Sequence, residues 1–299
     1  MDGSSLDVER LLSGQSGIIA GRRARLRAGF ADLLDDAALW SRLIPPRLKR
    51  AGRRATPRTV CVMGIYAADC AEHMARAVAE LERSNMRTDL VLGALDEPSP
   101  KLVAYTRASD LRGRGKFENL NLLIESLPES SARSLPASDA DWIVVIDDDV
   151  ELPRDFLDTF LFCAERFDFQ LVQPALRRTS HAAWSVCRRE RWTVARRTQM
   201  VEIGPLFAMR RCVVDALIPF PPLQMGWGLD LHWGGLAREH GWRVGVVDAL
   251  PVRHEARRTA SAYDRRAAVG ELREFLGGGR VHIDREAALQ VLERHLSWR

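Results

Sequence analysis

A run of apolar residues that ends in three aspartates limits the possible folds of this chain more than any other feature. Trp142 to Ile146 are all apolar, and Asp147, Asp148 and Asp149 follow directly. A short, uninterrupted, β-branched run is typical of a strand that is buried on both faces of a mostly parallel sheet. The three carboxylates therefore lie where such a strand ends. In open α/β sheets, ligands bind in the crevice outside the carboxyl ends of the strands.

Three adjacent carboxylates at one strand end repel one another, so a cation is needed nearby. A hard divalent ion takes oxygen ligands and can carry phosphate on its far side. Pro153 follows, and it can open a helix over 154–166 at its first turn. We therefore expect a metal or nucleotide site at Asp147–Asp149, with a solvated acidic turn as the alternative.

The composition is that of an ordinary soluble globular protein. Of the 299 residues, 46% are hydrophobic and 28% are charged, which is enough for one large domain or two modest ones. The net charge is +4, and we do not read the arginine-rich composition as a sign of nucleic-acid binding. Five cysteines without metal-ligand spacing suit a reducing compartment. Because the first residues lack an apolar signal core and no stretch reaches ~18 apolar residues, we expect a cytoplasmic protein.

Residues 1–58 are expected to form a helical N-terminal extension and a basic linker. Residues 8–19 and 24–43 have apolar side chains at helical spacing, and Pro45-Pro46 is expected to end the second helix. The basic segment 47–54 either contacts an anionic membrane surface peripherally or simply connects the helices to the main domain. Because the first core strand begins at Thr59, we expect the main domain to remain active without residues 1–55.

The main domain reads as a doubly wound α/β fold. A strand at 59–66, a helix at 70–84 and a strand at 88–95 form a first β-α-β unit, and Asp96 follows. The first turn lacks G-x-G-x-x-G, so a Rossmann dinucleotide site is unsupported. We expect further strands at 102–107, 170–174, 200–209 and 242–247, and further helices at 226–239, 262–275 and 285–296.

Two more segments carry candidate binding groups. Gly113 and Gly115 precede Lys116 and a helix that carries Asn119. A flexible turn before a helix N-terminus is a ready anion site, and a plain helix start is the alternative. Glu202 is a single acid within an apolar strand. One interpretation is that Glu202 contacts the substrate. The alternative is that it is an edge residue of the sheet or pairs with an arginine.

Taken in order, these features resemble the GT-A glycosyltransferases, specifically their family-2-like branch. Asp147-x-Asp149 looks like the DxD motif, Gly226-Trp227-Gly228-Leu229-Asp230 is similar to the acceptor-side W-G-x-[E/D]-D motif, and His254 follows a late strand. The same segments resemble an uncharacterised family of predicted glycosyltransferases from plants and bacteria. The resemblance covers residues 59–256 and leaves 257–299 as a C-terminal helical tail. It implies a GT-A-type, Rossmann-like mixed sheet, mostly parallel and flanked by helices.

The resemblance implies roles for residues on the donor side. Asp149 would ligate Mn²⁺ or Mg²⁺ on the donor diphosphate. His254 would complete the metal site, with a histidine that caps a strand end as the alternative. Asp147 would contact the ribose or uracil. The other donor-binding residues would be Asp96 at the edge of the base, Lys116 or Asn119 near the ribose and phosphates, and Asp148.

On the acceptor side, Asp230 corresponds to the catalytic base of inverting members and would accept the proton of the attacking hydroxyl. Trp227 would wall the sugar pocket, with Gly228 beside it. Leu229 replaces the first acid of the usual Glu-Asp pair, which makes the analogy looser. The implied activity is the metal-dependent transfer of a sugar to a small-molecule or glycan acceptor, with inversion. The donor would be a nucleoside diphosphate sugar, with UDP preferred to GDP.

Three alternatives remain open from the sequence. Asp147-x-Asp149 also fits the first motif of HAD-like aspartyl phosphatases, but that fold needs a later acidic pair and the sequence supplies only Asp248. A sugar nucleotidyltransferase shares the sheet architecture, although the Gly-rich phosphate loop is missing. A non-catalytic interaction protein would use the arginine-rich segments 47–58 and 177–197.

Overall fold

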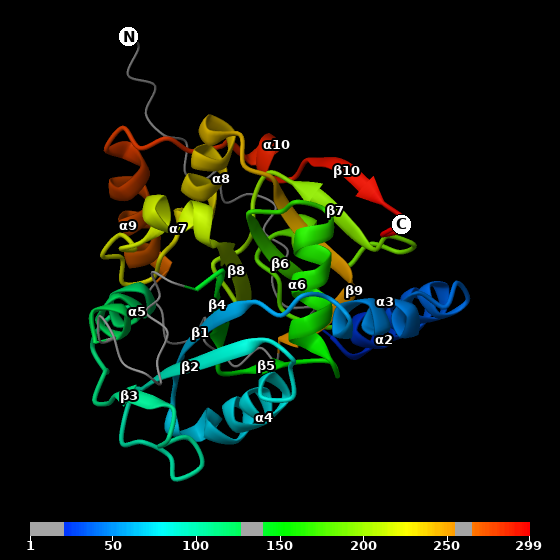
Figure 1. Cartoon of the computed structure of the whole chain (residues 1–299). Helices are drawn as coiled ribbons and strands as arrows, with labels where there is room; N and C mark the ends of the chain where they lie inside the picture. Colours follow the sequence, from blue (N-terminus) through cyan, green and yellow to red (C-terminus); the bar gives the residue numbers. More distant parts are fainter. Residues whose placement is uncertain (1–20, 127–139, 255–264) are drawn as a thin grey trace.

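The computed structural model describes residues 21–126, 140–254 and 265–299. These residues form a mixed sheet flanked by helices, with strand order β10-β7-β9-β6-β8-β4-β1-β2-β3 (Figure 1). Along this path only β7 and β8 run against the other strands. The expected mixed, mostly parallel α/β fold is therefore confirmed.

The described strands are β1 Thr59–Tyr66, β2 Arg87–Ala94, β3 Thr106–Ala108, β4 Trp142–Asp147, β5 Val150–Glu151, β6 Leu171–Leu176, β7 Ala195–Thr198, β8 Leu206–Arg210, β9 Val244–His254 and β10 Val291–His295. The described helices are α2 Arg22–Trp40, α3 Ile44–Arg53, α4 Ala71–Leu81, α5 Lys116–Glu125, α6 Phe156–Arg166, α7 Arg211–Leu217, α8 Leu229–His240, α9 Arg265–Gly277 and α10 Arg285–Ala288, with 3-10 turns η1 Ala68–Cys70 and η3 Ser185–Cys187. No helix among these is long and apolar enough to cross a membrane.

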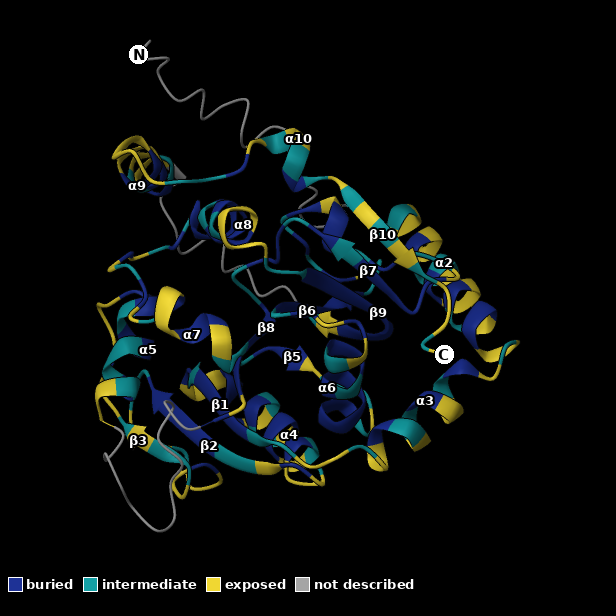
Figure 2. Ribbon diagram, turned by 45° about the horizontal axis from the view of Figure 1, so that its top comes forward, coloured by how far each residue is buried: buried dark blue, intermediate teal, exposed yellow. Residues whose placement is uncertain are grey.

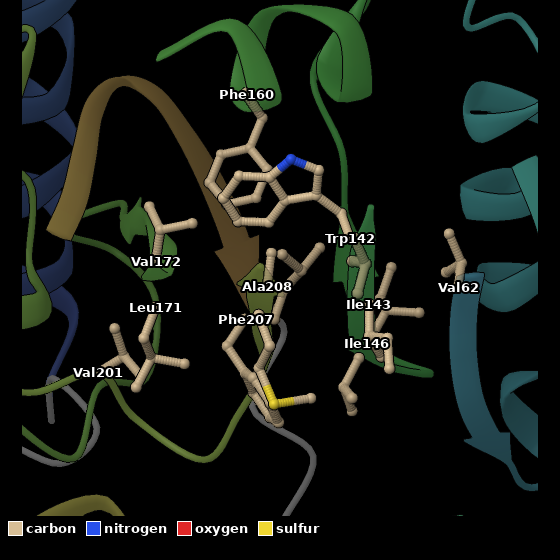
Figure 3. Close-up of a cluster of buried hydrophobic side chains, with 14 of the residues drawn as sticks. Val62, Trp142, Ile143, Ile146, Phe160, Leu171, Val172, Val201, Phe207 and Ala208 are labelled. Atoms are coloured by element: carbon tan, nitrogen blue, oxygen red, sulfur yellow. The ribbon is translucent and has the colours of Figure 1, made fainter. Parts of the chain in front are cut away.

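β4 lies in the middle of the core, as its sequence predicts. Residues Trp142 to Ile146 are at most 1% exposed. β1 pairs with β4 in parallel on one side and β8 pairs antiparallel on the other. Because neither face reaches water, each position takes an apolar side chain. Figure 3 shows Trp142 in one cluster with Phe160 of α6 and Phe207 of β8.

β8 begins at Leu206, later than the expected start at Met200. Residues 200–205 instead lie at the end of the sheet, and side chains from other elements form hydrogen bonds with their backbone groups. The Glu202 N–H donates to Gln173 Oε1 (2.6 Å), and Lys116 Nζ donates to the Ile203 carbonyl (2.7 Å). This segment therefore reaches the site as a loop.

The C-terminal helix expected over 285–296 is mostly absent from the structure. α10 ends at Ala288, and residues 291–295 form β10, which pairs antiparallel with β7. The side chains of β10 alternate between half-buried and exposed, a period-two pattern that suits a strand. Pairing also satisfies backbone groups of β7 that would otherwise form a sheet edge.

The N-terminal helices belong to the body of the molecule more closely than the sequence predicts. α3 starts at Ile44 and contains Pro45 and Pro46, because proline is tolerated in the first turn of a helix. The basic segment expected as a linker is therefore helical. Leu39, Ile44 and Leu48 are at most 3% exposed and join the main core cluster. The helix expected over 8–19 lies outside the described residues.

Candidate active site

The DxD residues lie at the carboxyl end of β4, beside the start of α5. Asp147 is the last residue of β4 and forms a 2.5 Å ion pair with Lys116, the first residue of α5. Gly204 passes so close that a Cβ atom there would lie 2.6 Å from Asp147 Oδ2. The structure thus brings together Asp147 and Lys116, which are 31 positions apart in the sequence (147 − 116 = 31).

Asp148 turns toward the loop after β1. Its Oδ2 accepts a hydrogen bond from the Ala67 N–H (2.8 Å). Burial raises the pKa of Asp148 to about 7, and the neighbouring Asp147 and Asp149 charges act in the same direction. This side chain therefore ties the acidic turn to β1, in addition to any contact with a ligand.

Asp149 and His254 face each other across the β5–β9 ladder, which aligns Val150 with His254. His254 Nε2 lies 3.1 Å from Asp149 Oδ1, and both side chains are largely buried. Burial lowers the pKa of His254, but the hydrogen bond and charge of Asp149 outweigh it and the net pKa is raised. The two residues that the resemblance assigns to a metal are thus in contact.

This pair fits a divalent cation. A carboxylate oxygen of Asp149 and a ring nitrogen of His254 face each other 3.1 Å apart, and both atom types are ligands that Mn²⁺ accepts. No group of three or more His, Cys, Asp or Glu side chains suited to a metal occurs in the described residues. The chain would supply two ligands, and phosphate oxygens and water would complete the shell, as is usual for Mg²⁺ at phosphate sites.

The segment before β7 supports His254. The His254 N–H donates to Ser180 Oγ (3.1 Å), and the ring of His181 lies edge-on to the His254 ring at 5.7 Å between centroids. The Nδ1 atoms of His181 and His254 are buried, and neither has a hydrogen-bond partner within the described ranges. Ser180 and His181 were not expected at the site, because nothing local in the sequence links them to β9.

Asp230 and Glu202 meet at one tryptophan. The Trp184 indole N–H donates to Asp230 Oδ2 (2.7 Å), and the Trp184 backbone N–H donates to Glu202 Oε1 (2.7 Å). Asp230 lies in the first turn of α8, but the N-cap is Gly228. Asp230 as a whole is only 8% exposed, so it is more enclosed than a residue that projects freely into a crevice.

Burial changes the acid–base properties of both carboxyls. It raises the pKa of Asp230 to about 6, despite the opposing hydrogen bond from Trp184. It raises the pKa of Glu202 to about 7, again against hydrogen bonds from the backbone. A carboxylate with a pKa near 6 is a stronger base at neutral pH than an exposed aspartate.

The turn that precedes α8 is held by the C-terminal part of the chain. Glu271 of α9 accepts hydrogen bonds from the N–H groups of Gln224, Met225 and Gly226 (2.6–3.3 Å). Trp227 is half-buried against the core. Gly228 has φ +89°, in the region that favours glycine, and packs against Leu272 and Leu276.

Two predicted donor-side residues have protein partners elsewhere. Asp96 follows β2 and forms an ion pair with Arg112, which lowers the pKa of Asp96. Asn119 is 1% exposed, and its Nδ2 donates to the Leu111 carbonyl (3.0 Å), so it braces the loop before α5. The structure does not bring either residue into contact with the pair of Asp149 and His254.

Trp184 and Glu271 are the main site residues that sequence reasoning missed. The arginine- and tryptophan-rich composition of 177–200 marked the region but not the individual tryptophan. The contact of Trp184 with Asp230 and that of Glu271 with Gly226 each join residues more than 40 positions apart along the chain. Only the three-dimensional fold reveals such contacts.

No family model matches the sequence, and no curated protein matches it. Solved structures do match. TarS 1-349 of S. aureus, crystallised with UDP-GlcNAc, is 10% identical with a TM-score of 0.51, over 76% of this chain and 68% of that one. GalNAc-T7, crystallised with UDP, GalNAc and Mn²⁺, is 13% identical with a TM-score of 0.50, over 68% of this chain. This chain spans only 44% of the GalNAc-T7 chain.

These neighbours define the class of fold. Both are GT-A glycosyltransferases, and the mixed sheet and flanking helices of the chain match theirs. At this level of identity the similarity shows a GT-A-type fold. Which reaction the chain carries out has to be argued from its own residues.

Proposed function

We propose that this chain is a metal-dependent glycosyltransferase that moves a sugar from a nucleoside diphosphate sugar to an acceptor hydroxyl. The observation that carries the proposal is the 3.1 Å pair of Asp149 and His254 at the carboxyl end of β4 in a GT-A-type sheet. A hard ion between these side chains would complete its shell with diphosphate oxygens. In an open α/β sheet the carboxyl ends of the strands are also where ligands bind.

The donor-side roles follow from charge and position. A bound Mn²⁺ or Mg²⁺ would neutralise the negative charge that grows on the departing diphosphate. Asp147 would accept hydrogen bonds from the ribose or the base, with Lys116 beside it at 2.5 Å. The Lys116 ammonium adds positive charge near the phosphates. Asp96, with its Arg112 partner, would lie toward the base.

Asp230 is the proposed general base. Its raised pKa of about 6 leaves it ionised at neutral pH but able to accept a proton from an acceptor hydroxyl. Trp184 orients one carboxylate oxygen through its indole N–H. Trp227, Gly228 and Glu202 would shape the sugar and acceptor side. A single carboxylate base and direct attack give inversion at the anomeric carbon.

The donor is proposed to be a UDP-sugar in preference to a GDP-sugar. Both reported neighbours were crystallised with a uridine nucleotide or nucleotide sugar, and one of them with Mn²⁺. The acceptor is a small molecule or a glycan, and nucleic acid is not among the proposed partners. A cytoplasmic location with peripheral membrane contact is also part of the proposal.

The alternatives lose support from specific contacts. A phosphatase would need Asp248 as a metal ligand, but Asp248 is fully buried and pairs with Arg196 (2.8 Å). An interaction surface formed by the arginines of 177–197 would need free guanidinium groups. Arg178 and Arg191 instead share the carboxylate of Asp35 (2.6 and 2.5 Å).

A thermal-shift screen tests the proposed function. The full chain would be melted with a panel of nucleoside diphosphate sugars, nucleoside triphosphates and phosphate esters, each with and without Mn²⁺. A shift that requires both a nucleoside diphosphate sugar and Mn²⁺ supports the proposal. A shift with triphosphates alone would favour the nucleotidyltransferase, and no shift with any nucleotide would contradict both.

A further inference from the structure

The first described helix, α2, has two chemically different faces. Its inner face carries Asp32 and Asp35, which are at most 5% exposed. Asp32 accepts hydrogen bonds from the N–H groups of Arg178 and Thr179 (2.9 and 3.2 Å), and Asp35 binds two guanidinium groups. These contacts fix α2 to the segment that continues into Ser180 and His181.

The outer face of α2 is apolar and exposed. Leu26, Phe30, Leu33 and Trp40 are 66%, 63%, 66% and 55% exposed. At 100° per residue these positions fall within about a quarter of a turn, so they form one stripe along the helix. Figure 2 shows α2 at the edge of the molecule, with exposed residues along it. An exposed apolar stripe of this length marks an interaction surface.

Within the described part of the chain, the exposed charged residues of α2 and α3 are basic. Residues 21–54 contain three acids. Asp35 and Asp36 form ion pairs with arginines of the segment 177–191, whereas Asp32 is buried and accepts hydrogen bonds from the backbone of Arg178 and Thr179. The exposed charged residues of α2 itself are arginines, namely Arg22, Arg23, Arg25 and Arg27. α3 adds Arg47 and Arg50, which are also exposed.

We infer that the outer face of α2 binds the surface of an anionic phospholipid membrane. An exposed apolar stripe flanked by arginines is the pattern of a helix that lies in the membrane interface, with apolar side chains among the acyl chains and cations at the headgroups. A second copy of the chain suits this face less well, because it would bring the same arginines against themselves. The inference deepens the peripheral membrane contact proposed above; it rests on α2 and α3 and not on the proposed glycosyl transfer.

Vesicle flotation of the full chain tests this inference. At low salt, the chain should float with phosphatidylcholine vesicles that contain phosphatidylglycerol and should not float with pure phosphatidylcholine. Phe30→Ser combined with Leu33→Ser should weaken binding about tenfold or more, because both side chains lose their insertion into the interface. Arg23→Glu combined with Arg27→Glu should also weaken vesicle binding about tenfold or more, because the acidic side chains are repelled by the anionic headgroups.

The matched control is Val103→Ser, which removes an apolar side chain that is 58% exposed in another part of the surface. It should bind vesicles like the unchanged chain. Circular dichroism checks that each variant is folded. No flotation with the anionic vesicles, or equal flotation of all variants, would overturn the inference. A dimer in sedimentation velocity that Phe30→Ser disrupts, without vesicle binding, would assign the face to a second copy instead.

Discussion

At the scale of single residues, Trp184 explains how two buried carboxyls can lie in one site. Its indole N–H donates to the carboxyl of Asp230, and its backbone N–H donates to the carboxyl of Glu202. A buried carboxylate without such a donor would be costly. Even with these bonds, desolvation dominates and both pKa values are raised. The site therefore keeps basic groups whose protonation changes near neutral pH.

We predict that Asp230→Asn lowers turnover by about 100-fold or more while donor affinity stays near that of the unchanged chain. Asparagine keeps an oxygen for the Trp184 indole but cannot accept the proton. Because the pKa of Asp230 is about 6, the rate of the unchanged enzyme should fall as the pH drops through 6 and the base becomes protonated. Steady-state kinetics over a pH series measures both effects.

Asp215→Asn is the matched control for this substitution, because Asp215 is exposed on α7 and pairs only with Arg211 among the described residues. It should leave turnover unchanged. Near-normal turnover of Asp230→Asn would return Asp230 to a structural role at the start of α8. A product that retains the donor's anomeric configuration would rule out single displacement.

The acidic turn could be predicted from the sequence, whereas its partners could not. Five successive apolar residues before Asp147 leave little choice but a central strand, and a strand end fixes where the carboxylates lie. The contact of Asp149 with His254 was expected only through the resemblance. The role of Trp184 depends on where a long irregular segment folds back, and no periodic pattern encodes that.

At the scale of elements, α9 holds the turn that leads into α8. Three successive backbone N–H groups, from Gln224 to Gly226, converge on the carboxylate of Glu271. Hydrogen bonds to a charged acceptor are stronger than those to a neutral one. We therefore regard Glu271 as a positioning residue for Trp227 and Asp230, although it lies in the tail outside the family resemblance.

We predict that Glu271→Gln raises KM for the acceptor about tenfold while the affinity for the donor nucleotide stays unchanged. The amide is a weaker acceptor for the three N–H groups, so the turn loses some of its fixed geometry. Glu274→Gln is the control, since Glu274 is exposed on the same helix. Equal loss of donor and acceptor affinity would mean that Glu271 only stabilises the fold.

The elements that the sequence misassigned share a physical cause. Residues 291–295 are a strand because β7 offers an unpaired edge, and a local sequence pattern cannot report that edge. α3 begins at Ile44. The two prolines that follow are typical of a helix end in the sequence, but proline also fits the first turn of a helix. The buried strands β1, β2 and β4 were predicted because burial on both faces leaves a direct mark on the sequence.

At the scale of the whole molecule, the N-terminal helices support the main domain. α3 packs on α6, and a Cβ atom at Gly52 would lie 2.8 Å from the Thr159 Cα atom. α2 braces Arg178 and Thr179, next to the residues that contact His254. That the main domain acts without residues 1–55 stays a prediction, and these contacts lead us to expect that such a truncation costs stability.

We predict that Leu48→Ala lowers the free energy of unfolding by about 2–5 kcal/mol, because it leaves a cavity where α3 meets the core. Leu48 is 1% exposed. Leu26→Ala is the matched control. Because Leu26 is 66% exposed, this substitution should change the free energy of unfolding by no more than about 0.5 kcal/mol. Denaturant unfolding of both variants measures this. Equal, small effects would show that α3 is a dispensable extension.

The central claim is that Asp149 and His254 hold a metal ion that binds the donor diphosphate, and calorimetric titration of UDP tests it most directly. Affinity should be measured with Mn²⁺ and with EDTA, for the unchanged chain, Asp149→Asn and His254→Ala. Glu151→Gln is the control, since Glu151 lies on the same ladder, is exposed and pairs with Arg253 (3.1 Å). We predict that EDTA and each of the two ligand substitutions weaken UDP binding by about tenfold or more, while Glu151→Gln leaves it unchanged. Undiminished UDP affinity in EDTA, or in Asp149→Asn with Mn²⁺ present, would contradict the claim.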